Sequence, residues 1–430
     1  MLFVYGDKIN NMKPSKNDLC ECGSGKKYKN CCLLKQSLGY KLNLKGKNAE
    51  NFVYELAQKS FFTDWCYQSP KLPNDKEICD LLIIFNEVAI IWQIKDLKLD
   101  DNNKYNEREV KKNIHQLSTA CRRLFELNIP IELENPRRGK ETFDPKSIKE
   151  IHLVSALLGK GEDHYSFAEY TKRQIIHTFT REFTQMVLNE LDTIDDFIEY
   201  LREKERLISL PIKIIIQGGE QELLAYYLMN QRNFDQFIEA NVLLIQEGLW
   251  SELNKKPEYL AKKKEDKISY LWDELINCAH SGGDNYELVA RELARLNRFQ
   301  RRSFSKAFFD AHVKAHHQKT KNTFRRIAKT NGTTYVFMFL DDPEPRTRRR
   351  NLLGTACYIA RGIFKENNKV IGIATEMKIQ EYCSYDFCLI ELPQWTKENQ
   401  NTMEELQKES GIFTKYTLNH VHEDEYPSNS

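Results

Sequence analysis

The distribution of apolar positions divides the chain into an N-terminal α/β region, a helical middle and a C-terminal α/β region. Residues 78–85 and 88–94 are two apolar runs separated by a two-residue turn, a pattern that predicts a β-hairpin. Apolar residues at helical spacing precede and follow the hairpin, in residues 48–59 and 107–127. The apolar run at residues 151–158 predicts the strand that completes this first α/β unit.

The rest of the chain predicts more helix than strand. An amphipathic helix is expected at residues 181–207, a short strand at 212–216 and helices through most of 220–330. Residues 130–145 have no clear period and are expected to form a loop. The acidic end, residues 421–430, is expected to fray. A second α/β unit is predicted from residues 333–340, 348–363, 370–374 and 387–392.

We therefore expect an α+β protein of several domains, whose main core is a mixed sheet flanked by helices. Its length of 430 residues corresponds to about two to three domains. The expected units are a small cysteine cluster, the first α/β unit, a mainly helical region of unknown role and a C-terminal α/β segment. Their predicted boundaries are 18–34, 46–158, 160–330 and 331–420.

The composition is that of a folded protein without a membrane anchor. Hydrophobic residues make up 41% of the chain and charged residues 29%, so wholesale disorder is not expected. No apolar stretch approaches the roughly 18 to 20 residues that span a bilayer, and the first residues lack a secretory pattern. We expect a cytoplasmic protein with no membrane partner.

Positive charge is concentrated in two segments, although the formal net charge is only +2. Residues 1–50 are rich in lysine, and residues 291–330 are rich in both lysine and arginine. Within the second segment, four arginines at helical spacing are predicted to line one face and to contact nucleic-acid phosphates. These are Arg291, Arg295, Arg298 and Arg302. A solvated face paired with the acidic residues near 192–205 is an equally good interpretation of the same pattern.

Four of the eleven cysteines fall within thirteen positions, in two closely spaced pairs. They are Cys20, Cys22, Cys31 and Cys32. Four thiolates suit one tetrahedral zinc ion, and the glycines between the pairs permit the tight turn that brings them together. With no open coordination position, the expected ion is structural rather than catalytic.

This string resembles the SEC-C motif, a small zinc-binding module. The family pattern is Cys-x-Cys-Gly-Ser-Gly-Lys-Lys-Tyr-Lys-x-Cys followed by His or Cys, and the sequence from Cys20 to Cys32 follows it, with Cys32 in the last position. The resemblance implies bound zinc. It leaves the partner open, since such modules are docking appendages for proteins or lie beside nucleic-acid sites.

Polar residues interrupt the predicted hairpin near one end. Asp80 lies in the first apolar run, and Gln93 and Lys95 close the second. Because Gln93 and Lys95 are two residues apart on a strand, their side chains point to the same face. One register of the hairpin also brings the carboxylate of Asp80 beside Gln93.

These residue types match the needs of phosphodiester hydrolysis. Magnesium takes hard oxygen ligands, and a nearby lysine can orient the attacking water. The predicted magnesium ligands are the side chains of Asp80 and Gln93 and the main-chain carbonyl of Ile94. Lys95 supplies the cation, and Glu50 in the preceding helix is the expected further carboxylate.

The layout resembles the PD-(D/E)XK nuclease superfamily, and within it the Mrr-like restriction endonuclease branch. In that branch a helix carries Gly-x-x-x-Glu, one strand carries Asp and the next carries Gln-x-Lys. Here these residues are Gly46 and Glu50, Asp80, and Gln93 with Lys95. The resemblance implies that Glu50, Asp80 and Gln93 hold magnesium and that Lys95 positions water. Glutamine replaces the acidic residue of the commoner motif and gives a neutral, weaker ligand.

The leading hypothesis is a magnesium-dependent endonuclease that acts on DNA and carries a zinc module, in a setting of restriction or anti-phage defence. An alternative is a non-catalytic adaptor, in which a degenerate nuclease fold binds nucleic acid or protein. A third is RNA cleavage, because phosphate contacts do not distinguish the two nucleic acids. Double-strand cleavage favours a homodimer, since each site then cuts one strand. An Asp80 side chain that faced away from Lys95 would contradict the enzyme hypotheses.

Overall fold

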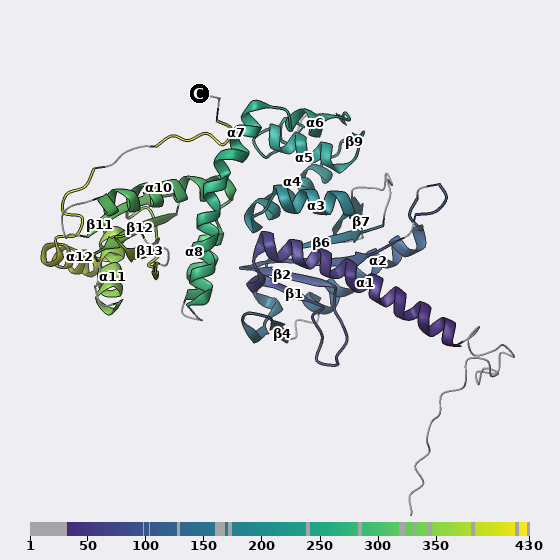
Figure 1. Cartoon of the computed structure of the whole chain (residues 1–430), viewed down its shortest axis with the longest axis horizontal. Helices are drawn as coiled ribbons and strands as arrows, with labels where there is room; N and C mark the ends of the chain where they lie inside the picture. Colours follow the sequence, from purple (N-terminus) through teal and green to yellow (C-terminus); the bar gives the residue numbers. More distant parts are fainter. Residues whose placement is uncertain are drawn as a thin grey trace, which may run out of the picture.

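The computed structural model contains two α/β lobes joined by helices (Figure 1). It describes residues 32–97, 99–102, 104–126, 130–159, 168–170, 174–237, 241–282, 286–317, 323–330, 332–341, 346–379, 383–417 and 421–427, with the side chains of 32–45, 169 and 170 left out. The mixture of helices and mixed sheets confirms the expected α+β class. Within these residues, none of the helices has the length and apolar character needed to cross a bilayer.

The N-terminal lobe is built on a six-stranded mixed sheet with the order β1-β2-β3-β6-β8-β7. Its strands are β1 (Cys66–Gln68), β2 (Leu81–Phe85), β3 (Val88–Lys95), β6 (Glu150–Leu157), β7 (Ala168–Tyr170) and β8 (Ile175–Thr180). The predicted hairpin is β2–β3, and its turn uses a positive φ of 54° at Asn86, a residue type that tolerates this conformation. Strands β3, β6 and β8 are parallel. Because β7 and β8 complete this sheet, the α/β unit extends past the predicted boundary at residue 158.

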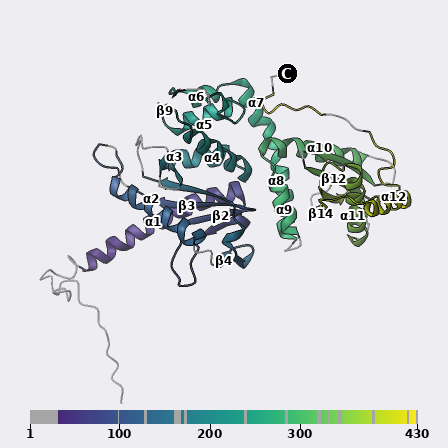
Figure 2. The same ribbon diagram turned by 180° about the vertical axis from the view of Figure 1, so that it is seen from behind.

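Two helices cover opposite faces of the sheet (Figures 1 and 2). They are α1 (Cys32–Phe61) and α2 (Glu107–Cys121), the latter followed by a π-helical turn, Arg122–Glu126. Alternate strand residues point to opposite sides, so Leu81 packs in one apolar cluster with Val53 of α1 while Leu82 packs in another with Leu117 of α2. The strands are therefore buried on both faces, which explains their nearly continuous apolar runs.

Helices dominate the middle of the chain, as expected. They are α3 (Arg181–Glu190), α4 (Ile194–Ile208), α5 (Glu220–Met229), α6 (Leu249–Leu253), α7 (Pro257–Glu265), α8 (Tyr270–Ser281), α9 (Glu287–Ala294) and α10 (Arg298–His317). The single helix expected at residues 181–207 is in fact two, because the Thr193 side chain accepts a hydrogen bond from the Asp196 N–H and caps a new helix. A short parallel pair, β9 (Lys213–Ile216) and β10 (Val242–Ile245), also interrupts this region.

The C-terminal lobe is a four-stranded sheet with the order β11-β12-β13-β14. Its elements are β11 (Phe324–Lys329), β12 (Thr333–Leu340), α11 (Arg346–Ile363), β13 (Lys369–Glu376), β14 (Asp386–Glu391) and α12 (Lys397–Ser410). Strands β12 and β13 are parallel, and α11 makes the crossover between them. The lobe thus begins with β11, a few residues before the predicted boundary at 331.

Two further predictions were wrong. The expected loop at residues 130–145 contains a hairpin, β4 (Ile131–Asn135) with β5 (Gly139–Phe143). Its buried apolar side chains belong to the same cluster as Leu117 of α2. The chain end does not fray over residues 421–427. Instead it returns to the helical middle (Figure 1), where the Tyr426 hydroxyl donates to the carbonyl of Leu228 at 2.9 Å.

Candidate functional site

The β2–β3 hairpin pairs Asp80 with Gln93. The ladder places Leu81 opposite Trp92, and the Asp80 N–H still donates to the Trp92 carbonyl at 3.2 Å. The Gln93 Nε2 group donates to Asp80 Oδ2 at 2.6 Å, and the Ile94 N–H donates to the same oxygen at 2.5 Å. Both side chains are buried. The hairpin register that brings the carboxylate beside Gln93 is the one observed.

The main chain of Gln93 is anchored by the helix on the same side of the sheet. Asn113 of α2 is fully buried, and its Nδ2 group donates to the Gln93 carbonyl at 3.2 Å and to Ser155 Oγ at 2.8 Å. Asn113 was not among the residues predicted for this site from the sequence. A polar residue within the stripe formed by Val110, Asn113 and Leu117 is the signal that would have revealed it.

Several charged groups meet at this end of the sheet. Burial raises the pKa of Asp80 to about 7, although the Ile94 N–H and the Lys95 ammonium group oppose the shift, and Glu50 and Glu77 add to it. Burial also raises the pKa of Glu50, with Glu77 adding to the rise and Lys95 opposing it. Three carboxyl groups therefore interact with one another, and the raised pKa values of Asp80 and Glu50 show that Lys95 and Lys47 do not fully offset their burial, an arrangement that favours an added cation.

The donor atoms fit a hard divalent cation. In the described part of the chain, Asp80 Oδ1 and Gln93 Oε1 accept no hydrogen bond, and neither Glu50 nor Lys95 forms a salt bridge. The oxygen atoms left without a hydrogen bond thus belong to a carboxylate and an amide, the ligands that Mg²⁺ prefers. The Ile94 N–H is committed to Asp80, and its carbonyl stays a predicted ligand.

The predicted zinc ligands are not described in the structure. Cys20, Cys22 and Cys31 lie outside the described residues, and Cys32 is the first residue of α1, where no side chain is described. The seven cysteines whose side chains are described are free thiols. The cluster therefore ends at the first residue of α1, the same helix that carries Glu50.

The expected arginine face does not exist as a single helical face. Helix α9 ends at Ala294 and α10 begins at Arg298, so the intervening turn changes the phase of the four positions. Arg298 and Arg302 are buried, where they pair with Asp192 at 2.8 Å and Asp266 at 3.0 Å.

The other two arginines, Arg291 and Arg295, pair with Glu287 and Glu292. The prediction that Arg298 and Arg302 contact nucleic acid is therefore wrong, because both arginines are buried and carboxylates of the same chain already pair with them. The pairing of Arg298 with Asp192 follows the second interpretation, although the site is buried rather than solvated.

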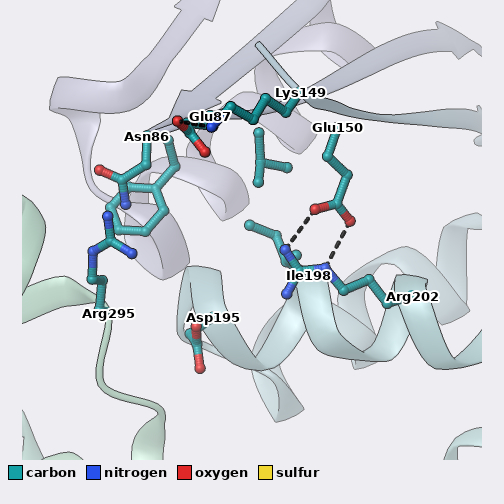
Figure 3. Close-up of a pocket in the computed structure, with 10 residues that line it drawn as sticks. Asn86, Glu87, Lys149, Glu150, Asp195, Ile198, Arg202 and Arg295 are labelled. Carbon is teal, nitrogen blue, oxygen red and sulfur yellow. Dashed lines mark hydrogen bonds and ion pairs between the residues drawn. The ribbon is translucent and has the colours of Figure 1, made fainter. Parts of the chain in front are cut away.

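A pocket of about 220 Å³ lies at the opposite end of the sheet, beside the β2–β3 turn (Figure 3). Its lining is largely charged. Three cations line it, and each forms an ion pair: Lys149 with Glu87, Arg202 with Glu150, and Arg295 with Glu292, which lies outside the lining. Asp195 also lines the pocket, and burial raises its pKa to about 7. None of the residues predicted to hold a metal ion lines this pocket.

Comparison with known proteins assigns one segment of the chain. Neither the curated proteins nor the solved structures contain a match. Residues 17–34 match the SEC-C motif family, and this segment includes all four clustered cysteines. The chain therefore carries a SEC-C motif, compatible with zinc binding, that overlaps the start of α1.

Proposed function

We propose that this protein is a metal-dependent endonuclease that hydrolyses phosphodiester bonds in nucleic acid, with DNA as the expected substrate. The observation that carries the proposal is the hydrogen bond between Asp80 and Gln93 at the polar end of the sheet, with Glu50 and Lys95 close enough to influence the pKa of Asp80. Oxygen ligands beside an unpaired lysine are the groups that metal-assisted phosphodiester hydrolysis needs.

The order of elements supports the proposal. The resemblance to Mrr-like nucleases implies a helix with Glu50, then a hairpin with Asp80 and the Gln93 to Lys95 motif, then a further helix. The chain has α1, the β2–β3 hairpin and α2 in this order, with α1 and α2 on opposite faces of the sheet. The parallel strand β6 then joins β3.

Each residue has a distinct proposed role. Asp80, Glu50, Gln93 and the Ile94 carbonyl would hold Mg²⁺, which when bound polarises the phosphate and lowers the pKa of the attacking water. The Lys95 ammonium group would position this water and offset the negative charge that develops on the phosphate. Asn113 would keep the Gln93 main chain in place through its 3.2 Å hydrogen bond.

For the SEC-C motif we propose a structural zinc ion held by four thiolates. Cys20, Cys22, Cys31 and Cys32 would leave no open coordination position, so the ion would stabilise a small fold rather than take part in hydrolysis. The motif runs into α1, which carries Glu50, and it would bind nucleic acid or a protein partner. We further propose a homodimer, with each site cutting one strand, in restriction or anti-phage defence.

Cleavage assays test the proposal. Plasmid DNA, single-stranded DNA and RNA are incubated with the wild-type protein and with Lys95→Ala, in Mg²⁺ and in chelator. Lys149→Ala is the matched control, because Lys149 is an exposed lysine at the opposite end of the same sheet. Mg²⁺-dependent cleavage that disappears in Lys95→Ala and persists in Lys149→Ala supports the nuclease and identifies its substrate.

A different outcome would favour the adaptor hypothesis. The Asp80 carboxylate already receives two hydrogen bonds from within the chain, so the hairpin end is satisfied in part without a metal ion. If no substrate is cleaved while the wild type and Lys95→Ala bind nucleic acid equally, the nuclease proposal fails and a binding-only function replaces it.

A further inference from the structure

Two histidines and a glutamate converge away from the candidate nuclease site, between the sheet and α4. His152 lies on β6, His177 on β8 and Glu205 on α4. The Glu205 Oε1 atom is 2.8 Å from His152 Nδ1 and 2.9 Å from His177 Nε2. The three donor atoms lie within 4.8 Å of one another, and both imidazoles are almost completely buried.

Two of the three groups already have the form that a metal ion requires. Although burial opposes it, hydrogen bonds from His152 and His177 lower the pKa of Glu205 to about 2, so this carboxylate is ionised. Burial lowers the pKa of His177 to about 4, so its imidazole is neutral at neutral pH. Neutral imidazole and carboxylate are the ligand forms that zinc and related ions bind.

The third proposed ligand, His152, is oriented by the carboxylate of Glu150. His152 Nε2 contacts Glu150 Oε1 at 2.8 Å, and the other oxygen of Glu150 pairs with Arg202 at 2.6 Å (Figure 3). Metal-binding histidines commonly donate their second ring nitrogen to a carboxylate in this way, because the contact fixes the ring and its tautomer. With Nε2–H committed to Glu150, the Nδ1 atom of His152 is the one aimed at Glu205.

We propose that His152, His177 and Glu205 form a site for a divalent first-row transition-metal ion, with Zn²⁺ as the first candidate. Two imidazoles and one carboxylate are a ligand set of such ions, with a remaining position for water. Glu205 is the solvent-facing member of the cluster, because its side chain is 28% exposed while both imidazoles are buried.

Small movements would convert the hydrogen-bonded cluster into a metal site. In tetrahedral coordination with bonds of about 2.0 Å, neighbouring ligand atoms are about 3.3 Å apart. The present contacts of 2.8 and 2.9 Å therefore need to widen only slightly. The ion takes the place of the two hydrogens now shared with Glu205. Although burial opposes it, the hydrogen bonds to Glu150 and Glu205 raise the pKa of His152, so this ring releases its Nδ1 proton to solvent when the ion binds. The His177 proton moves from Nε2 to Nδ1, which has no partner in the described part of the chain.

The bound ion would connect three elements that are distant in sequence. Strands β6 and β8 are parallel neighbours in the sheet, and α4 packs in the apolar cluster on one face of it. An ion held by one ligand from each would stabilise this packing and raise the unfolding temperature, since it binds only the folded chain.

Cobalt substitution tests the proposal on the full-length chain. The parent carries Cys20→Ser and Cys22→Ser to disable the SEC-C motif, and excess Mg²⁺ occupies the site around Asp80. We expect one equivalent of Co²⁺, with absorption typical of nitrogen and oxygen ligands and no thiolate charge-transfer band. Glu205→Gln should weaken binding at least about 100-fold, since it replaces a charged ligand by a neutral amide.

Glu203→Gln, on the same helix and paired with Arg206, is the matched control and should bind as the parent does. Glu150→Gln, which leaves all three donors in place, is a second variant and should weaken binding about 10- to 100-fold. If Glu205→Gln does not fold, the Glu150→Gln variant still tests the proposal. The absence of a Co²⁺ equivalent in the parent, a thiolate band, or unchanged binding in the folded Glu205→Gln or Glu150→Gln variant would overturn the proposal.

Discussion

Gln93 donates a hydrogen bond of 2.6 Å from its side-chain amide to the carboxylate of Asp80, at the end of a buried hairpin. An amide carries no charge, so it holds the carboxylate in place without neutralising it. Asp80 therefore stays an ionisable acid in a buried position, and burial raises its pKa to about 7. A bound divalent cation would relieve this unfavourable burial, and this links the stability of the hairpin end to its proposed chemistry.

Replacing Asp80 should therefore stabilise the metal-free protein. The pKa of Asp80 is higher in the folded than in the unfolded chain, so the folded state binds the extra proton and stability falls as pH rises from about 4 to about 7. Asp80→Asn removes this loss. With chelator present, the unfolding free energy of Asp80→Asn should exceed that of the wild type by an amount that grows with pH, by up to about 1.4 kcal/mol per pH unit up to about pH 7. Urea unfolding of both proteins at several pH values measures this difference in unfolding free energy. A difference that does not change with pH would argue against a buried, titrating Asp80.

The pH dependence of cleavage should report the same carboxyl group. Protonated Asp80 cannot hold a cation, so at low Mg²⁺ the rate should rise between about pH 6 and pH 8. Added Mg²⁺ competes with the proton, so the midpoint should move to lower pH as its concentration increases. Initial rates over a grid of pH and Mg²⁺ test this. A midpoint independent of Mg²⁺ would mean that another group controls the rate.

Arg302 should matter for stability and not for nucleic-acid contact. Its guanidinium group is buried and pairs with Asp266 and with Glu423 from the returning chain end. Arg302→Ala removes a buried ion-pair partner from both carboxylates, which keep Lys262 and Lys306 as partners, and should cost about 3 kcal/mol of unfolding free energy. Arg295→Ala, at a half-exposed arginine, should cost less than about 1 kcal/mol. A stable Arg302→Ala protein with lost nucleic-acid affinity would restore the discarded binding role.

Asn113 should support the site through the Gln93 main chain. Asn113→Ala removes the hydrogen bonds to the Gln93 carbonyl and Ser155 and should cost about 1 to 3 kcal/mol. It should also lower kcat more than it raises KM, because Gln93 is displaced while substrate-binding groups are not. Lys112→Ala, an exposed neighbour on α2, is the control for both measurements. An unchanged kcat would mean that Asn113 does not support the catalytic site.

The sequence predicted the hairpin end because its determinants are local. The two-residue turn at Asn86 fixes the register, which makes Asp80 and Gln93 partners. The pairing of Asp80 with Gln93 was therefore foreseen as one of the allowed registers. The four clustered cysteines were identified for a similar reason, since the whole motif lies within a few turns of chain.

The remaining features depend on partners far away in sequence. Arg302 looked like a surface residue because Asp266 and Glu423, which bury its charge, follow no local pattern with it. The cluster of His152, His177 and Glu205 likewise exists only once β6, β8 and α4 are packed together. Periodicity within one helix or strand could not reveal either.

In the proposed nuclease, Glu50 and Asp80 act as one unit on a single metal ion. The cleavage rates of Glu50→Gln, Asp80→Asn and the double variant test this coupling. Residues that serve one ion lose their effect together, so each single change should reduce kcat nearly as far as the double change does. Full activity in either single variant, or losses in the double variant that equal the product of the single losses, would contradict the account.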